Sequence, residues 1–197
     1  MTSPLLAGRG IWKSFGAAPV LRGVGFEVRP GEVHALVGAN GAGKSTLVKI
    51  LYGALRPDRG DLYWRDSHIP GGDLRHTAAR GVAYIPQEIQ VIPHLSLTEN
   101  LFLGNPLRRA RFLVDHTAQQ VSALSVLEQV GINRDPATRA RDLSVAEQQL
   151  LMIGRALVRR VELVILDEPT ASLTSAEVDT LFALIRRLKE KIGRAHV

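Results

Sequence analysis

The sequence predicts a mixed α/β fold with a helical insertion in its middle. A glycine-rich segment, residues 38–43, lies between a short apolar run and a segment with a helical pattern. A second apolar run, residues 163–166, ends in two consecutive carboxylates. Between these features, from about Ser96 to Val158, apolar residues recur at helical spacing. Such an order is typical of a sheet whose ligand lies at the carboxyl ends of its strands.

Length, composition and charge exclude several classes of function. The 197 residues, 45% of them hydrophobic, suffice for one domain with a substantial core. No apolar run approaches the roughly 18 residues that a membrane span needs, and cysteine is absent, which excludes disulfides and thiolate metal sites. The net charge of +6 comes from arginines scattered singly and in pairs, and aromatic residues make up only 5% of the chain. We therefore expect solvated surface charge and no nucleic-acid partner.

The first third of the chain predicts an antiparallel β subdomain. Val24, Phe26 and Val28 alternate with small or polar residues and end at a Pro-Gly turn, as a half-exposed strand does. Residues 62–64 follow a turn at residues 57–60 and predict another strand. Residues 82–85 predict a short strand that Pro86 ends.

The glycine-rich segment fits the phosphate-binding pattern G-x-x-x-x-G-K-[ST] at every required position. Residues 33–37 before it predict a short buried strand, and residues 46–52 after it predict a helix. An ordinary glycine-rich turn would not require the Lys-Ser pair that follows. The predicted phosphate loop consists of Gly38, Ala39, Asn40, Gly41, Ala42, Gly43, Lys44, Ser45 and Thr46.

These residue types have a clear chemical use in such a loop. Glycine lets the backbone curl tightly and approach a ligand without a Cβ clash. The N–H groups of the first helical turn then point toward one place, where the helix dipole adds positive potential. Lys44 supplies a mobile charge for the outer phosphates, and the Ser45 hydroxyl can ligate Mg²⁺.

Three helices are predicted after residue 96. Leu124, Leu127 and Val130 share one helical face, and Gly131 ends that helix. Ser144 and Glu147 form a capping box, so a second helix begins near Ser144.

A similar box opens the third helix. Thr174 and Glu177 have capping-box spacing just after the acidic strand. We expect the apolar side of this helix to contain Val178, Leu181, Phe182, Ile185 and Leu188.

Two carboxylates follow the apolar strand at residues 163–166. Asp167 can hold Mg²⁺ through water, and Glu168 can orient or polarise a water that attacks a γ-phosphate. Taken alone, the pair fits a solvated turn equally well. The phosphate loop upstream favours the catalytic interpretation.

The order of these motifs resembles the nucleotide-binding domains of ABC-type ATPases, which are P-loop NTPases. It consists of the phosphate loop, Gln87, the capped helix at Ser144 and the LVILDEP strand. The stretches GEVHALVGANGAGKSTLVKILYG, LSLTENLFLG, LSVAEQQLLMIGRAL and VILDEPTASLT are similar in particular to the ATPase subunit of bacterial importers for sugars such as ribose, xylose and galactose. The resemblance implies one nucleotide-binding domain over residues 5–191, with a helical subdomain at about 90–158.

The resemblance also implies roles that composition alone does not. Phe15 matches the aromatic residue that stacks on adenine, with Trp12 as a nearby competitor and a core position as the alternative. Gln87 matches a glutamine that reaches Mg²⁺ and the attacking water. Ser144 matches the serine that clamps ATP bound to an opposite domain. Residues 171–174 match a segment that crosses the interface between the two domains.

The signature at Ser144 differs from the commonest family form, LSGGQ. Val145 and Ala146 replace both glycines, and Glu147 replaces the glutamine. We expect these side chains to loosen the approach to the γ-phosphate somewhat. A glutamate near phosphate is unfavourable unless it folds back as a cap. Sugar-importer ATPases often carry similar variants, so the change does not imply inactivity.

The implied function is ATP hydrolysis that powers sugar import. Two such domains would close on two ATP·Mg²⁺, with Glu168, Gln87 and Lys44 as catalytic residues. Ser45, Gln87 and Asp167 would hold the metal. The implied partners are permease transmembrane subunits, a second ATPase domain in tandem or as a dimer and, indirectly, a sugar-binding protein. The chain would then lie peripherally at the cytoplasmic face of the membrane.

Two alternatives remain from the sequence. One is a soluble ABC-type ATPase that acts on ribosomes or DNA, although long helical or strongly basic insertions are lacking. The other is a P-loop kinase or GTPase outside the ABC class, which Ser144 and its helix disfavour. The identity of the sugar cannot be read from these residues.

The end of the chain departs from the family pattern. There, a further buried strand and a histidine that contacts the γ-phosphate follow the last helix. Here residues 192–197 resemble a translated sequencing adapter, so we interpret them as a non-native tail on a gene truncated within its first nucleotide-binding domain. A natural short tail is the alternative. Without the missing strand we expect a gap in the sheet and an inactive chain.

Overall fold

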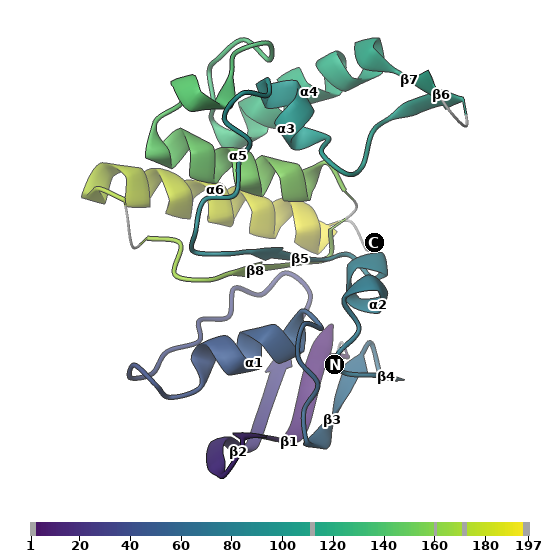
Figure 1. Cartoon of the computed structure of the whole chain (residues 1–197), viewed down its shortest axis with the longest axis vertical. Coiled ribbons are helices and arrows are strands. Elements are labelled where there is room, and N and C mark those ends of the chain that lie inside the picture. The colour runs from purple at the N-terminus through teal and green to yellow at the C-terminus, as the bar shows by residue number, and fades with distance from the viewer. Residues whose placement is uncertain (1–2, 111–112, 160, 171–172, 195–197) are drawn as a thin grey trace. The chain divides into compact units, whose positions relative to one another are not determined.

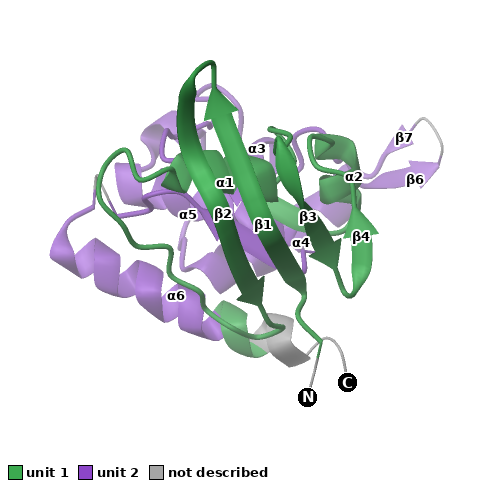
Figure 2. Ribbon diagram, turned by 90° about the horizontal axis from the view of Figure 1, so that it is seen from below, with its two compact units in different colours: residues 1–83, 188–197 green, residues 84–187 purple. Residues whose placement is uncertain are grey.

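The computed structural model describes residues 3–110, 113–159, 161–170 and 173–194. The chain forms two compact units, and each is described by itself (Figure 2). The first consists of residues 1–83 with residues 188–197, and the second of residues 84–187.

The first unit contains a four-stranded antiparallel sheet in the order β2-β1-β3-β4. Its strands are β1 (Leu6–Phe15), β2 (Ala18–Val28), β3 (Arg59–Trp64) and β4 (Ser67–Ile69). The strands predicted at Val24–Val28 and at residues 62–64 are therefore confirmed.

Pairing within this sheet brings apolar residues of three strands together. Leu6 is opposite Val28 on one neighbour and opposite Trp64 on the other. Leu6 and Ile11 are completely buried. The antiparallel β subdomain predicted from the alternating pattern is thus present, and its strands contribute to the core.

Two helices complete the first unit. Helix α1 (Lys44–Leu51) lies against β2 and buries Leu47, Val48 and Ile50. Helix α2 (Leu74–Ala79) begins after Asp73, whose side chain accepts the His76 N–H. The helix predicted after the glycine-rich segment is confirmed, beginning two residues earlier than expected.

The buried strand predicted before the phosphate loop is wrong. Residues 33–37 form no strand, and Val33, Leu36 and Val37 are 57%, 45% and 88% exposed. A buried strand needs neighbouring strands for its backbone N–H and C=O groups. No described strand pairs with this segment, so its backbone stays in contact with solvent.

The acidic motif follows a strand, as predicted, but the strand is not fully buried. Strand β8 (Leu163–Leu166) pairs with β5 (Val82–Ile85) in a two-stranded sheet. All four residues of β8 are only partly buried. Among the described residues β5 is its only partner strand. One edge of this apolar strand therefore has no neighbouring strand.

The second unit is mainly helical (Figure 1). Its helices are α3 (Leu97–Leu101), α4 (His116–Val130), the short 3₁₀ helix η1 (Ala140–Asp142), α5 (Val145–Leu157) and α6 (Ser175–Arg194), whose last residues belong to the first unit.

The continuous helical pattern predicted between residues 96 and 158 is interrupted. Strands β6 (Arg108–Ala110) and β7 (Leu113–Val114) form a short antiparallel hairpin between α3 and α4. All their residues are exposed. Because no buried face repeats in so short a hairpin, the apolar pattern gave no sign of it.

Helix α4 ends as predicted, but its buried face is shifted. Gly131 caps it in the left-handed conformation with a φ of 83°. Leu127 and Val130 are buried, whereas Leu124 is 55% exposed. Ala123 and Val126 take its place on the buried face, which packs against α3 and α5.

Helix α5 packs closely against its neighbours at Gly154. A Cβ atom there would lie 3.0 Å from Leu101 of α3 and 3.2 Å from Val126 of α4. The single glycine thus lets three helices approach, which compensates for its low helix propensity.

Helix α6 begins at the predicted box, where Glu177 accepts the Thr174 N–H and hydroxyl, both at 2.8 Å. Leu181 and Leu184 are buried, but Phe182, predicted to be on the apolar side, is 45% exposed. Of the predicted tail, residues 192–194 continue α6, and residues 195–197 lie outside the described residues. Within the described residues, no helix is long and apolar enough to span a membrane.

The register of α4 can be tested with two equivalent truncations. We expect Leu127→Ala to lower the free energy of unfolding by about 2–5 kcal/mol, because it removes fully buried atoms. Leu124→Ala, on the same helix, serves as the control and changes it by about 0.5 kcal/mol or less. Chemical denaturation measures both values. Equal losses for the two variants would mean that the buried face includes Leu124.

Candidate functional site

Helix α1 begins in an unusual way. Its N-cap is Gly43 in the left-handed conformation, with a φ of 91°, and no side chain caps it. No acidic residue lies in its first turn. The N–H groups of a first helical turn have no partner inside the helix, so here they are left for a ligand or water. By contrast, α2, α3, α4 and α5 each begin after a residue whose side chain accepts a backbone N–H, namely Asp73, Ser96, Asp115 and Ser144.

Only glycine fits at position 43. Besides the positive φ, a Cβ atom there would come within 2.8 Å of Leu21 and 3.1 Å of Val20, both on β2. Gly41 also has a positive φ, of 80°, but a Cβ atom there would meet nothing within 4 Å. The sheet of the first unit therefore fixes where the loop turns into the helix.

Lys44 folds back over the loop. Its Nζ donates to the carbonyl oxygens of Gly38 at 2.6 Å and Ala39 at 3.0 Å. The Ser45 side chain next to it is exposed. The loop thus presents one cation, one hydroxyl and the N–H groups of α1 on a single solvent-facing surface.

Phe15 does not belong to the core. It lies at the end of β1 and is 53% exposed, so the alternative of a core aromatic is wrong. The ammonium of Lys13 lies 5.9 Å from the centre of its ring. Trp12, the competitor, is 43% exposed. Both rings belong to the same unit as the phosphate loop.

In the second unit, hydrogen bonds fix the position of Asp167. Its N–H donates to the Ile85 carbonyl at 3.0 Å, and one of its carboxylate oxygens accepts from the Tyr84 hydroxyl at 3.0 Å. Tyr84, which lies on β5 far away along the chain, was not among the predicted site residues. The sequence feature that could have identified Tyr84 is an aromatic hydroxyl two residues before Pro86 on a predicted strand.

The turn after Asp167 is held in an uncommon conformation. Glu168 is exposed and has a φ of 42°, which few residues other than glycine adopt. The buried side chain of Gln149 donates to the Pro169 carbonyl at 2.7 Å. Gln149 belongs to α5, so this helix anchors the turn that carries Glu168.

Gln87 is exposed and lies two residues after β5. The segment that follows it is attached to α5, because Arg155 donates to the Gln90 carbonyl at 3.0 Å. Arg155 also contacts the buried Asn100 of α3, whose side chain holds the backbone of Ile92. Asn100 and Arg155 were not predicted, since nothing in the sequence around them distinguishes them.

The capping box at Ser144 is confirmed. The Ser144 N–H donates to the Glu147 carboxylate at 2.8 Å, and the Glu147 N–H donates to the Ser144 hydroxyl at 3.2 Å. Arg134 also binds this carboxylate, with its Nε 3.0 Å from Oε1. The expectation that Glu147 folds back as a cap is therefore correct.

The pKa of Glu147 reflects these contacts. Partial burial alone raises it, but the hydrogen bonds from the Arg134 side chain and the Ser144 N–H outweigh burial and hold the pKa below its usual value. Glu147 is thus a paired carboxylate at neutral pH.

The predicted site residues fall into two groups. The phosphate loop and Phe15 lie in the first unit, whereas Gln87, Ser144, Asp167 and Glu168 lie in the second. Of the predicted interface segment, residues 171 and 172 lie outside the described residues. The described part of the chain has no cluster of three histidine, aspartate or glutamate side chains that could hold a metal. The predicted metal set contains only one carboxylate and does not depend on such a cluster.

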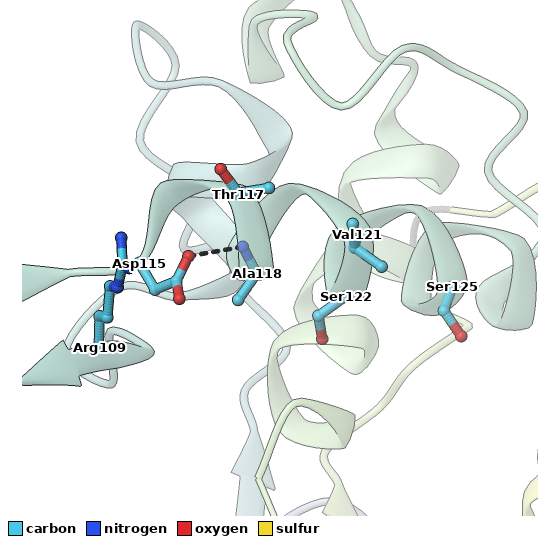
Figure 3. A pocket seen from close by; sticks show the side chains of 7 residues that line it. All are labelled: Arg109, Asp115, Thr117, Ala118, Val121, Ser122 and Ser125. Carbon is cyan, nitrogen blue, oxygen red and sulfur yellow. Dashed lines mark hydrogen bonds between the residues drawn. The ribbon is translucent and has the colours of Figure 1, made fainter.

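A cavity of about 720 Å³ has none of these residues in its lining. Figure 3 shows it between the β6–β7 hairpin and α4. The Asp115 carboxylate in its lining already caps α4 by accepting the Ala118 N–H at 2.9 Å. The cavity is lined by Arg109, Asp115, Thr117, Ala118, Val121, Ser122 and Ser125. The sequence predicts none of them as a site residue.

A family model described as ABC transporter matches residues 21–171, which include the phosphate loop, the box at Ser144 and the acidic motif. The chain belongs to the ABC transporter family. The alternative of a P-loop kinase or GTPase outside this family is therefore wrong.

Relatives of this ABC transporter chain are similar over nearly all of it. The ribose import ATP-binding protein RbsA 1 of Rubrobacter xylanophilus is 45% identical over 188 residues, which cover 95% of this chain and 38% of that protein. Its namesake in Streptomyces coelicolor is 44% identical over 194 residues, or 96% and 38% of the two chains. The chain thus spans less than half the length of these relatives. They give no support to the alternative of an ATPase acting on ribosomes or DNA.

A solved structure is similar in fold. The ATP-binding cassette MJ1267 of an ABC transporter, in its ADP conformation, matches with a TM-score of 0.84 and 27% identity. The match covers 96% of this chain and 78% of that one. The predicted fold class, an ABC-type nucleotide-binding domain of the P-loop NTPases, is confirmed.

The steric role of Gly43 in this ABC transporter chain can be measured against Gly41. Each alanine substitution places a side chain in the left-handed region, at a cost of about 1–2 kcal/mol. Only Gly43→Ala also collides with β2, so we expect it to lose about 1–3 kcal/mol more than Gly41→Ala. Denaturant unfolding measures the difference. Equal losses would show that β2 does not constrain the loop.

Proposed function

We propose that this chain binds ATP with Mg²⁺ and supplies catalytic residues for its hydrolysis. The observation that carries the proposal is the uncapped start of α1, with Lys44 folded over the same loop. Unpaired N–H groups, a helix dipole and one cation together make a site for phosphate. The exposed Phe15 in the same unit offers a face on which adenine can stack.

The proposed metal ligands are oxygen-bearing side chains, which Mg²⁺ prefers. Ser45, next to the loop lysine, offers an exposed hydroxyl ligand. Asp167 keeps an acceptor for a metal-bound water, because Tyr84 engages only one of its carboxylate oxygens. Gln87 would be the third residue that holds the metal. Bound Mg²⁺ would neutralise charge that develops on the transferred phosphoryl group.

Glu168 is proposed to orient and deprotonate the attacking water. Its side chain is exposed on a turn with a positive φ, and Gln149 anchors this turn through the Pro169 carbonyl. Lys44 would leave the loop carbonyls to bind the outer phosphates, because a phosphate offers it stronger charge-assisted hydrogen bonds.

Ser144 is proposed to act on the ATP of a second domain. The start of α5 presents its hydroxyl and a helix dipole, while its glutamate is occupied by the capping box and by Arg134. Two domains would then close face to face on two nucleotides, and hydrolysis would reopen them. The second domain would be a tandem domain or another copy of this chain.

The named relatives support sugar import as the process that this hydrolysis powers, since both are called ribose import ATP-binding proteins. Permease subunits would convert closure into transport, with a sugar-binding protein delivering the substrate. The chain would lie peripherally at the cytoplasmic face of the membrane.

The role of Glu168 is tested by Glu168→Gln in the complete gene product that contains this sequence. We expect ATP binding to persist and the rate of hydrolysis to fall about 100-fold or more, because a general base is lost. Phosphate release measures the rate, and a fluorescent nucleotide measures binding. Glu162→Gln, just before β8, is the matched control and leaves the rate unchanged. Unchanged hydrolysis in Glu168→Gln would remove Glu168 from this role.

The role of Lys44 is tested by Lys44→Ala. We expect ATP affinity itself to fall about tenfold or more, because a charge-assisted contact to phosphate is lost. Lys49→Ala removes an exposed lysine from the last turn of the same helix and should leave the affinity unchanged. Equal affinities in the two variants would contradict the proposed phosphate site.

A further inference from the structure

Three helices of the second unit begin at capping boxes, but the hydrogen bonds within these boxes differ. In the boxes before α3 and α6, the hydroxyls of Ser96 and Thr174 donate to the glutamate of their own box at 2.8 Å. At α5, the Ser144 hydroxyl accepts the Glu147 N–H at 3.2 Å, and its contact with the Glu147 carboxylate is the weakest of those that lower the pKa of Glu147. Of the three boxes, this one binds its glutamate least through the hydroxyl.

Arg134 accounts for the difference. It lies in the connection after α4 and binds both oxygens of Glu147, with its Nε 3.0 Å from Oε1 and its Nη2 3.4 Å from Oε2. No arginine or lysine makes such an ion pair with the glutamates of the other two boxes among the described residues. The guanidinium thus donates to the glutamate carboxylate, as the hydroxyl of the box residue does in the other two boxes.

We propose that Arg134 is a positioning residue for the signature end of α5. It holds the Glu147 carboxylate away from the phosphate side and leaves the Ser144 hydroxyl proton for a phosphate oxygen. The inference rests on the proposed function, in which Ser144 contacts ATP held by a second domain. Arg134 would thereby offset the negative charge of Glu147 beside the bound phosphate.

The electrostatics agree with this arrangement. The hydrogen bond and charge of Glu147 raise the pKa of Arg134, and Asp142 adds to the effect. Among the contacts that lower the pKa of Glu147, the Arg134 side chain is the strongest and the Ser144 hydroxyl the weakest. For Glu99 and Glu177, the backbone N–H and the hydroxyl of the box residue lower the pKa most.

The test is a double-mutant cycle in the complete gene product. The variants are Arg134→Ala, Glu147→Gln, both together, and Arg134→Lys. Arg141→Ala is the matched control, because Arg141 is a similarly exposed arginine close to the signature that pairs with Asp142 instead. ATP hydrolysis gives kcat and KM for each variant. Carboxyl ¹³C NMR gives the pKa of Glu147, and thermal unfolding gives stability.

We expect Arg134→Ala to raise KM for ATP about three- to fivefold, the range of a partly exposed ion pair, with kcat within about twofold of the parent value. In the Glu147→Gln background the same change should have no further effect, since no charge is left to hold. Arg134→Lys should restore most of the affinity, and Arg141→Ala should leave KM unchanged. The pKa of Glu147 should rise in Arg134→Ala.

Other outcomes would overturn the inference. An equal rise of KM in both backgrounds, together with lower stability, would mean that Arg134 merely attaches its loop to α5. A parent-like KM, or an unchanged pKa of Glu147 in Arg134→Ala, would mean that Arg134 does not govern this carboxylate. Absence of ATP hydrolysis in the parent protein would instead overturn the proposed function, and the inference with it.

Discussion

The start of α1 is the constraint on which the rest of the account depends. A helix leaves its first N–H groups without partners, and natural sequences usually supply a side chain to accept one of them. Four helices of this chain follow that rule, whereas α1 begins at Gly43 with no side-chain cap. The close approach of β2 keeps residue 43 a glycine. The chain thus maintains an unsatisfied, positively polarised helix end, which costs stability unless an anion binds there.

Helix α5 organises the other half of the proposed chemistry. Its first turn carries the signature serine, Gln149 holds the turn after Glu168, and Arg155 holds the segment after Gln87. Three proposed contacts with nucleotide and water are therefore attached to one rigid element within the second unit. A shift of α5 would move all three together. This gives a physical reason why closing on ATP and positioning the attacking water would occur as one event.

Prediction from the sequence succeeded where the signal is local. Caps, glycine turns and the phosphate loop depend on residues a few positions apart. The starts of α5 and α6 agree with prediction, and α1 begins within two residues of it. It failed for residues 33–37, because burial of a strand is decided by neighbouring strands. It could not find Tyr84 or Arg134, whose partners lie 83 and 13 residues away along the chain. Leu124 was misplaced because several faces of α4 carry apolar residues, and packing selected one of them.

The central claim is that ATP binds through the exposed N–H groups at the start of α1. Nitrogen-resolved NMR during a nucleotide titration tests it most directly, because a hydrogen bond to phosphate moves an amide proton resonance. The account predicts that Gly43, Lys44 and Ser45 show the largest shifts with ATP and ADP and much smaller ones with AMP, which lacks the outer phosphates. Saturable ATP binding that leaves these three amides unchanged, or equal shifts with AMP, would contradict it.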